Sequence, residues 1–234
     1  MYLSRLRLNA RNRATRRDLG DLQAIHRTIM SAFPTAGPTA PAEQRVLWRL
    51  EPDAHRGSAV LLVQSATAPD WSRLAPGYLE DDRPEVKPID AALASVASGM
   101  RLRFRLVANP TKRVLGEEHP DGRHAKGERI PLRGDEALLA WLARKGVDAG
   151  FSVGPDSAGA ARAVVIRPLG DLVGWRPRDS GDRASQLTLR GVAFDGILMV
   201  TDASRLRGAV ASGIGSGKAY GFGLLSLAPG GGPR

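Results

Sequence analysis

The chain has no cysteine and no long apolar run, and each absence excludes a class of protein. Without cysteine there is no disulfide framework, no thiolate metal site and no cysteine nucleophile. No apolar segment approaches the roughly 18 residues that a membrane-spanning helix needs. The N-terminus alternates polar and apolar residues instead of forming the hydrophobic stretch of a signal peptide. We therefore expect a cytoplasmic protein without membrane association.

Histidine is also scarce, and its spacing does not indicate a metal centre. The four histidines are His26, His55, His119 and His124. None of them forms the H-E-x-x-H pattern or another ligand spacing. The G-x-S-x-G elbow of the serine hydrolases is absent as well. The sequence predicts neither a bound metal nor a cofactor.

Positive charge, in contrast, is abundant. Lysine and arginine number 34 against 24 acidic residues, which gives a net charge of +10, and arginine supplies most of the excess. The planar guanidinium fork suits phosphate groups, so this balance favours a nucleic acid as partner. An arginine-rich composition inherited from a GC-rich genome is the alternative explanation.

The first half of the chain has the element order of a ferredoxin-like domain. The predicted elements are a strand at 2–8, a helix from the N-cap Asp18 to Phe33 with Pro34 as its stop, strands at 45–51 and 58–66 that form a hairpin, a short helix at 90–97 and a strand at 100–108. These predictions follow from alternation in the strands and helical spacing in the helix. The resulting order is βαββαβ.

The second half begins with a basic, irregular stretch at 109–134 and then mixes strands and helices again. The predicted elements are a helix at 134–148, strands at 150–154 and 161–167, a long hairpin within 171–195 with a basic tip, a strand at 192–200, a helix at 203–211 and a strand at 220–227. From this order we infer a second ferredoxin-like unit. The predicted fold class is α+β, with tandem ferredoxin-like domains at 1–109 and 110–234.

Residues 213–223 read Gly-Ile-Gly-Ser-Gly-Lys-Ala-Tyr-Gly-Phe-Gly. Glycine at this density indicates backbone with positive φ or in close contact with a bulky group. Successive N–H groups beside Lys218 suit an anion such as phosphate. Neither the Walker A loop nor the G-x-G-x-x-G dinucleotide pattern fits the spacing. A flexible glycine hairpin is the alternative.

His26 lies at the edge of the apolar stripe of the first predicted helix, beside Gln23 and Met30. A histidine at that place is either a boundary residue of the core or a general acid or base. RNA carries its own nucleophile, the 2′-hydroxyl. A metal-free RNA cleavage site therefore needs only in-line positioning, one group that moves a proton, and cations near the phosphate. This chain offers those ingredients.

Four segments, spread in order over most of the chain, carry a family resemblance. They are Met-Tyr-Leu-Ser-Arg-Leu at the N-terminus, 21–34, Val46-Leu47-Trp48-Arg49 and 213–227. In these segments the sequence resembles the CasE family, the CRISPR RNA endoribonuclease subunit of the Cascade complex. The resemblance implies tandem ferredoxin-like domains that bind the repeat stem-loop of precursor CRISPR RNA.

The same resemblance implies an activity. The enzyme would cleave at the 3′ base of the hairpin without metal, leave a 2′,3′-cyclic phosphate and a 5′-hydroxyl, retain the hairpin and join other Cascade subunits. His26 falls on the family's catalytic histidine, and Gln23 stands where the family often has a tyrosine. Lys218 would offset phosphate charge.

Basic side chains and loop glycines are the candidates for RNA binding. They are Arg27, Lys112, Arg113, Arg129, Arg133, Arg176, Arg178, Arg183, Gly213, Gly215, Gly217 and Lys218. A-form RNA hides its base edges in a deep, narrow major groove, so phosphate and ribose contacts should dominate. Two other functions stay open: a non-catalytic RNA-binding subunit of the same superfamily, in which His26 is structural, and a basic structural RNA-binding protein.

Overall fold

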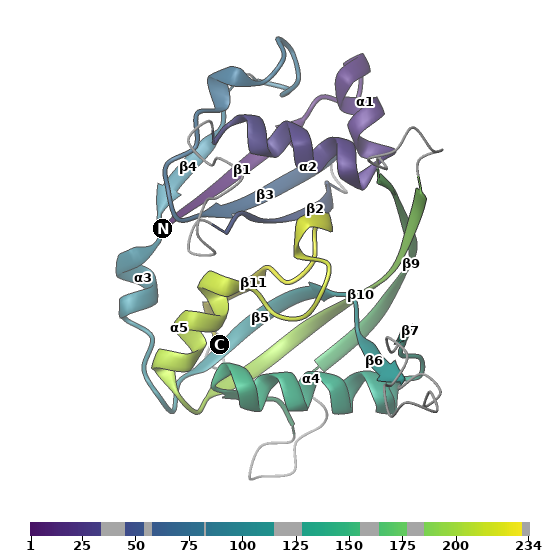
Figure 1. Cartoon of the computed structure of the whole chain (residues 1–234). Helices are drawn as coiled ribbons and strands as arrows, with labels where there is room; N and C mark the ends of the chain where they lie inside the picture. Colours follow the sequence, from purple (N-terminus) through teal and green to yellow (C-terminus); the bar gives the residue numbers. More distant parts are fainter. Residues whose placement is uncertain are drawn as a thin grey trace, which may run out of the picture.

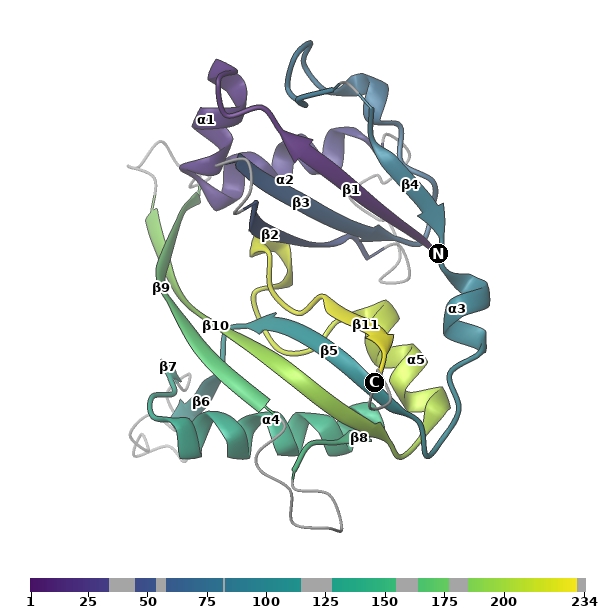
Figure 2. The same cartoon turned by 180° about the vertical axis from the view of Figure 1, so that it is seen from behind.

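The computed structural model describes residues 1–33, 45–53, 58–81, 83–114, 128–154, 164–176 and 185–230. The predicted helix stop Pro34 and the candidates Arg178 and Arg183 lie outside these residues. Two antiparallel sheets stand one above the other in Figure 1. Seen from behind in Figure 2, the strands lie in front of α2 and α4, so helices cover the same side of both sheets.

The first sheet has the strand order β2-β3-β1-β4. Its strands are β1 (Tyr2–Leu8), β2 (Leu47–Asp53), β3 (Ser58–Ser65) and β4 (Glu85–Pro88). β2 and β3 pair antiparallel, which confirms the predicted hairpin, and β1 is the predicted first strand. Between β3 and β4 the described residues form only one 3-10 turn, η2 (Trp71–Arg73), where a ferredoxin-like unit would have its second helix.

The single predicted helix beginning at Asp18 is wrong in its start, because two helices occupy that region. They are α1 (Arg13–Leu19) and α2 (Leu22–Ser31). The N-cap of α2 is Asp21, whose carboxylate accepts a hydrogen bond from the Gln23 amide at 2.9 Å. Asp18 is instead buried within α1, where it accepts a hydrogen bond from the Tyr78 hydroxyl at 2.9 Å. A second cap three residues downstream thus competed with Asp18 for the same role.

The predicted strand at 100–108 is confirmed as β5 (Arg101–Ala108), but its assignment to the first sheet is wrong. β5 pairs antiparallel with β10 (Ser185–Val200) and β11 (Leu225–Pro229) in the second sheet. The predicted short helix, α3 (Asp90–Ala94), follows β4 and leads into β5. Alternating basic and apolar residues indicate a half-buried strand without indicating which sheet it joins.

The second sheet has the order β11-β5-β10-β8, and β9 also pairs with β10. The remaining elements are α4 (Asp135–Ala149), β8 (Phe151–Ser152), β9 (Val164–Arg176), α5 (Ala203–Ser212) and η3 (Lys218–Tyr220). The helices predicted at 134–148 and 203–211 are confirmed. The β9–β10 pairing confirms the predicted hairpin. The stretch predicted as irregular contains a small hairpin, β6 (Thr111–Val114) and β7 (Glu128–Pro131).

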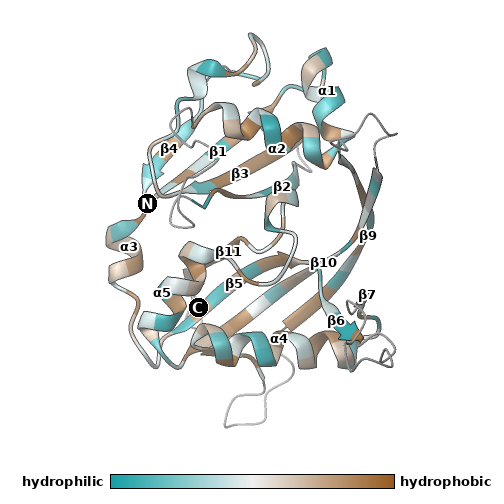
Figure 3. Ribbon diagram, viewed as in Figure 1, coloured by the Kyte–Doolittle hydropathy of each residue, from teal (hydrophilic) through white to brown (hydrophobic). Residues whose placement is uncertain are grey.

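Each sheet packs its own hydrophobic core against its helices. The second core contains Trp141 of α4 stacked on Phe194 of β10, with ring centroids 6.0 Å apart. The first core contains Ile25 and Ile29 of α2 packed with Trp48 of β2. Figure 3 shows hydrophobic residues concentrated along β3 and β10. In the described part of the chain, no helix is both long and apolar enough to span a bilayer.

Candidate nucleic-acid interface and active site

The glycine stretch at 213–223 forms a closely packed loop between the two sheets. All five of its glycines have positive φ, for example 75° at Gly213 and 85° at Gly221. A Cβ at Gly221 would lie 2.8 Å from the ring of Trp48, and one at Gly213 would lie 2.8 Å from Leu47. The loop therefore needs glycine both for its backbone conformation and for space. Both features predicted from the glycine density, positive φ and close contact with a bulky group, are confirmed.

Hydrogen bonds fasten this loop to both sheets. The Gly223 amide donates to the Val107 carbonyl at 2.8 Å, and the Ile214 amide donates to the Gly223 carbonyl at 2.9 Å. From the first sheet, the Trp48 indole N–H donates to the Ala219 carbonyl at 3.2 Å. Figure 1 shows the loop, drawn in yellow, between α2 and α4. The fold thus holds the loop backbone beside the first predicted helix.

His26 projects from the middle of α2 and is half-buried. Its Nδ1 atom is fully buried and has no hydrogen-bond partner among the described residues. Burial lowers the pKa of the imidazole, because desolvation disfavours the charged form. The ring is therefore neutral at pH 7. A buried polar atom without a partner is costly, and such exceptions often occur at functional sites, so this atom marks His26 as a candidate functional residue.

Lys218 of the glycine loop lines the same groove as His26. Arg45 and Arg129 also line it, together with the loop residues 215–219. Burial lowers the pKa of the Lys218 ammonium, and the nearby charges of Arg45 and Lys145 lower it further. Cations held together against their repulsion stabilise an anion placed between them. The groove thus combines one neutral imidazole with an anion-attracting wall.

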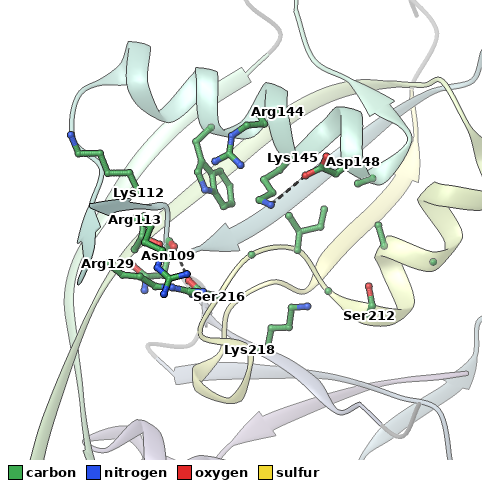
Figure 4. Close-up of a pocket in the computed structure, with 18 of the residues that line it drawn as sticks. Asn109, Lys112, Arg113, Arg129, Arg144, Lys145, Asp148, Ser212, Ser216 and Lys218 are labelled. Carbon is green, nitrogen blue, oxygen red and sulfur yellow. Dashed lines mark hydrogen bonds and ion pairs between the residues drawn. The ribbon is translucent and has the colours of Figure 1, made fainter. Parts of the chain in front are cut away.

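A wider cavity of about 930 Å³ shares Arg129 and Lys218 with this groove. In Figure 4, Lys112, Arg113 and Arg129 lie on one side of it, and Arg144 and Lys145 lie on α4. Among the described residues that line it, the one acid is Asp148, whose carboxylate is 3.4 Å from the Lys145 ammonium. Such a concentration of one charge in a concave surface attracts a polyanion.

Two arginines of the small hairpin face each other directly. Arg113 of β6 is the cross-strand partner of Arg129 of β7. Like charges in that register destabilise a β-ladder. Among the residues whose side chains the structure describes, neither arginine forms an ion pair with an acid. A phosphate oxygen between two guanidinium groups would relieve this repulsion.

Asn109, at the end of β5, adds a polar group to the wall of the cavity. Its side-chain Oδ1 is buried and lacks a hydrogen-bond partner within the described residues. Its backbone carbonyl accepts a hydrogen bond from the Ser216 hydroxyl at 3.3 Å. Both buried polar atoms without a partner in the described part of the chain thus belong to residues that line the groove or the cavity.

Several predicted site residues do not join this surface. Gln23 lies in the first turn of α2, where its backbone N–H lies next to Gly174 of β9. It lines neither the groove nor the cavity. Arg27 is exposed and also lines neither. Arg133 is exposed near Asp171, where its charge contributes to lowering the pKa of that carboxyl. Arg176 ends β9.

The predicted residues that come together are His26, Lys112, Arg113, Arg129, Lys218 and the glycines 213, 215 and 217. Sequence reasoning missed Arg45, Asn109, Arg144, Lys145 and Arg205. Arg144 and Lys145 did carry a local signal: two successive cations on a helix whose opposite side is apolar indicate a charged outer face.

Comparisons with known proteins identify the relatives of this chain. A family model described as CRISPR associated protein matches residues 1–229. The CRISPR-associated endoribonuclease Cse3 of Thermus thermophilus is 38% identical over 231 residues, covering 98% of this chain and 100% of the relative. The CRISPR system Cascade subunit CasE of Escherichia coli K12 is 32% identical over 212 residues, covering 89% and 92%.

Solved structures give the same result. Cse3 bound to a 19 nt RNA matches with a TM-score of 0.78 and 37% identity, over 98% of this chain and 100% of that one. Cas6e of Escherichia coli K-12 matches with a TM-score of 0.64 and 27% identity, over the same shares. The two tandem ferredoxin-like units and the resemblance seen in the sequence are thereby confirmed. The chain belongs to the CasE/Cse3 family of CRISPR-associated proteins.

Proposed function

We propose that this protein is a metal-independent endoribonuclease that cleaves precursor CRISPR RNA at the 3′ base of the repeat stem-loop. The observation that carries the proposal is that His26 of α2 and Lys218 of the glycine loop line one groove. The relatives support the substrate: one is named a CRISPR-associated endoribonuclease, and Thermus thermophilus Cse3 has been solved with an RNA representing a pre-cleavage complex.

The groove supports cleavage by the RNA's own 2′-hydroxyl. The neutral imidazole of His26 accepts the 2′-hydroxyl proton, since a lowered pKa favours the unprotonated form. The 2′-oxygen then attacks the adjacent phosphorus, and the bond to the 5′-oxygen breaks. The departing 5′-oxygen takes a proton from solvent, and His26 returns the proton that it accepted to solvent. Lys218 stabilises the charge that develops on the phosphate. The products are a 2′,3′-cyclic phosphate and a 5′-hydroxyl.

The wide basic cavity binds the paired stem. Lys112, Arg113 and Arg144 project into it and suit phosphates across the stem. The first unit, predicted as 1–109, supplies the catalytic helix, and the second, predicted as 110–234, supplies the basic cavity. The pairing of β5 in the second sheet supports a boundary nearer residue 100. Gln23 and Arg27 would contribute only by contacts with RNA outside the groove.

Cleaved RNA stays bound and enters a Cascade assembly in the cytoplasm. The support for this partner is the relative named a Cascade subunit and the similarity to a chain of a CRISPR RNA-guided surveillance complex, with a TM-score of 0.65 and 29% identity.

The decisive experiment incubates the purified protein with its repeat RNA in EDTA and analyses the ends of the products. We expect cleavage with a 2′,3′-cyclic phosphate, and none when the scissile nucleotide is 2′-deoxy. A requirement for Mg²⁺, or a 3′-hydroxyl product, would contradict the mechanism. Tight hairpin binding without any cleavage would point to a non-catalytic RNA-binding subunit.

A further inference from the structure

Two successive residues of β2 reach the C-terminal loop from opposite faces of the strand. They are Trp48 and Arg49, which are 1% and 2% exposed. Both belong to the segment Val46-Leu47-Trp48-Arg49, which has no part in the proposed chemistry. Successive side chains of a strand point to opposite faces, so Trp48 attaches to the glycine loop and Arg49 to the residues that follow it.

Arg49 binds the chain where the loop ends. Its guanidinium donates to the Leu224 carbonyl at 3.0 Å and to the Arg105 carbonyl at 3.3 Å. It also donates to the Ser226 hydroxyl at 2.9 Å, and Glu51 of its own strand balances its charge. A planar group with donors in several directions can satisfy all of these acceptors at once, which a lysine cannot.

Trp48 binds the middle of the same loop. Its indole N–H donates to the carbonyl of Ala219, the residue after Lys218. Its ring lies against Gly221 so closely that no side chain fits there. The two residues therefore attach one position and six positions after Lys218. Both contacts come from the first sheet, which also packs against the helix of His26.

We infer that Trp48 and Arg49 are positioning residues that hold Lys218 at the groove opposite His26. The second sheet carries the loop and the first unit carries the histidine, so contacts across the boundary fix how the ammonium faces the imidazole. What Lys218 binds there rests on the proposed function. The placement of its ammonium does not.

A double-mutant cycle tests the inference through RNA affinity. Using a hairpin with a 2′-deoxy scissile nucleotide, we expect Arg49→Lys and Lys218→Ala each to weaken binding by roughly tenfold, the loss of about one charge-assisted hydrogen bond. The double variant should bind no worse than Lys218→Ala alone, because both changes remove the same interaction, the contact of the Lys218 ammonium with RNA. The control pair, Arg49→Lys with Lys112→Gln, should be additive. Additive losses in the first pair would overturn the inference.

A spectroscopic measurement tests the same placement without RNA. The chain has five lysines, so ¹³C-dimethylation gives few signals, and Lys218→Arg assigns the one of interest. We expect Arg49→Lys to move the Lys218 signal and raise its pKa toward the ordinary value, while the Lys112 signal stays in place. An unchanged Lys218 titration would overturn the inference. A changed titration with unchanged RNA affinity would contradict only the role that the proposed function gives to Lys218.

Trp48→Phe provides a second variant if Arg49→Lys does not fold. It keeps an aromatic ring against Gly221 and removes the indole donor to Ala219. The same cycle with Lys218→Ala should be non-additive, and the same lysine signal should move. Rescue of both readouts is expected only when arginine and tryptophan are restored together in the doubly substituted chain. Full recovery with either residue alone would contradict a joint role.

Discussion

The wide basic cavity and the narrow groove beside α2 both suit an anion, but they are built differently. Lys112, Arg113 and Arg129 reach the cavity as exposed side chains from a small hairpin. In the groove, His26 and Lys218 are half-buried, and desolvation lowers the pKa of both. Hydrated charges favour association over a large surface, whereas dehydrated groups held by backbone suit chemistry. The comparison assigns affinity to the cavity and the chemical step to the groove.

The largest expected effect is the loss of cleavage in His26→Ala. General acid–base groups contribute roughly 10²- to 10⁴-fold, so we expect the single-turnover rate at saturating RNA to fall by about that factor. Affinity for the 2′-deoxy hairpin should not change, because the neutral ring contributes no charge to binding. Quench-flow kinetics and filter binding measure the two quantities. Equal losses in rate and affinity would contradict the assignment of the chemical step to the groove and of affinity to the cavity.

The next effect concerns the cavity. Replacing Lys112, Arg113 and Arg144 by glutamine should weaken RNA binding and flatten its salt dependence by about 2 in the slope of log K against log salt. The rate of cleavage at saturating RNA should remain that of the unmodified protein. Binding isotherms at several salt concentrations provide the slope. An unchanged slope would mean that these side chains do not contact phosphates.

Lys218 lines both the groove and the cavity, and its replacement has the next largest expected effect. Lys218→Ala should reduce affinity for the hairpin by roughly tenfold, as expected for one lost charge-assisted contact. Cleavage of the RNA that is bound should slow by less. Lys218→Arg, which keeps the charge, serves as the matched control. A rate loss that exceeds the affinity loss would make Lys218 a catalytic group first.

The smallest effect is on stability, and its sign follows from burial of His26. The pKa of His26 is lowered in the folded protein, so the unfolded chain binds the proton more readily. Wild-type protein should therefore lose stability as the pH falls from about 6.5 toward the lower folded pKa. His26→Gln should lose less over the same interval. Urea unfolding at pH 7.5 and pH 5.5 measures the difference, and parallel pH profiles would contradict burial of the imidazole.

Local sequence patterns predicted most elements correctly, and the errors arise from tertiary contacts that local patterns do not encode. The helices at 134–148 and 203–211 were predicted from their apolar spacing, and Asp202 is the observed N-cap of the second. The start at Asp18 failed because capping alone does not reveal that this carboxylate is buried under Tyr78. The sheet of β5 failed because pairing over more than 80 residues leaves no local signal.

The candidate site also combines features that local sequence patterns indicate with features that depend on tertiary packing. Glycine density and Lys218 indicated the loop, and the position of His26 on its helix indicated a boundary residue. Their meeting in one groove depends on packing between two sheets, which periodicity does not encode. Arg45 and Asn109 gave no signal at all, because each is a single polar residue beside an ordinary strand.

The contact between Gly221 and the ring of Trp48 has a consequence for how this family can vary. Shrinking residue 48 would clear the space that a side chain at 221 needs, yet φ at Gly221 would still be 85°, which other residues rarely adopt. The backbone conformation therefore requires glycine at 221 even when the contact with residue 48 is removed. We expect drift among relatives to change the tryptophan before the glycine, so the glycine spacing should outlast the aromatic residue in distant members and remain the more durable sequence signature.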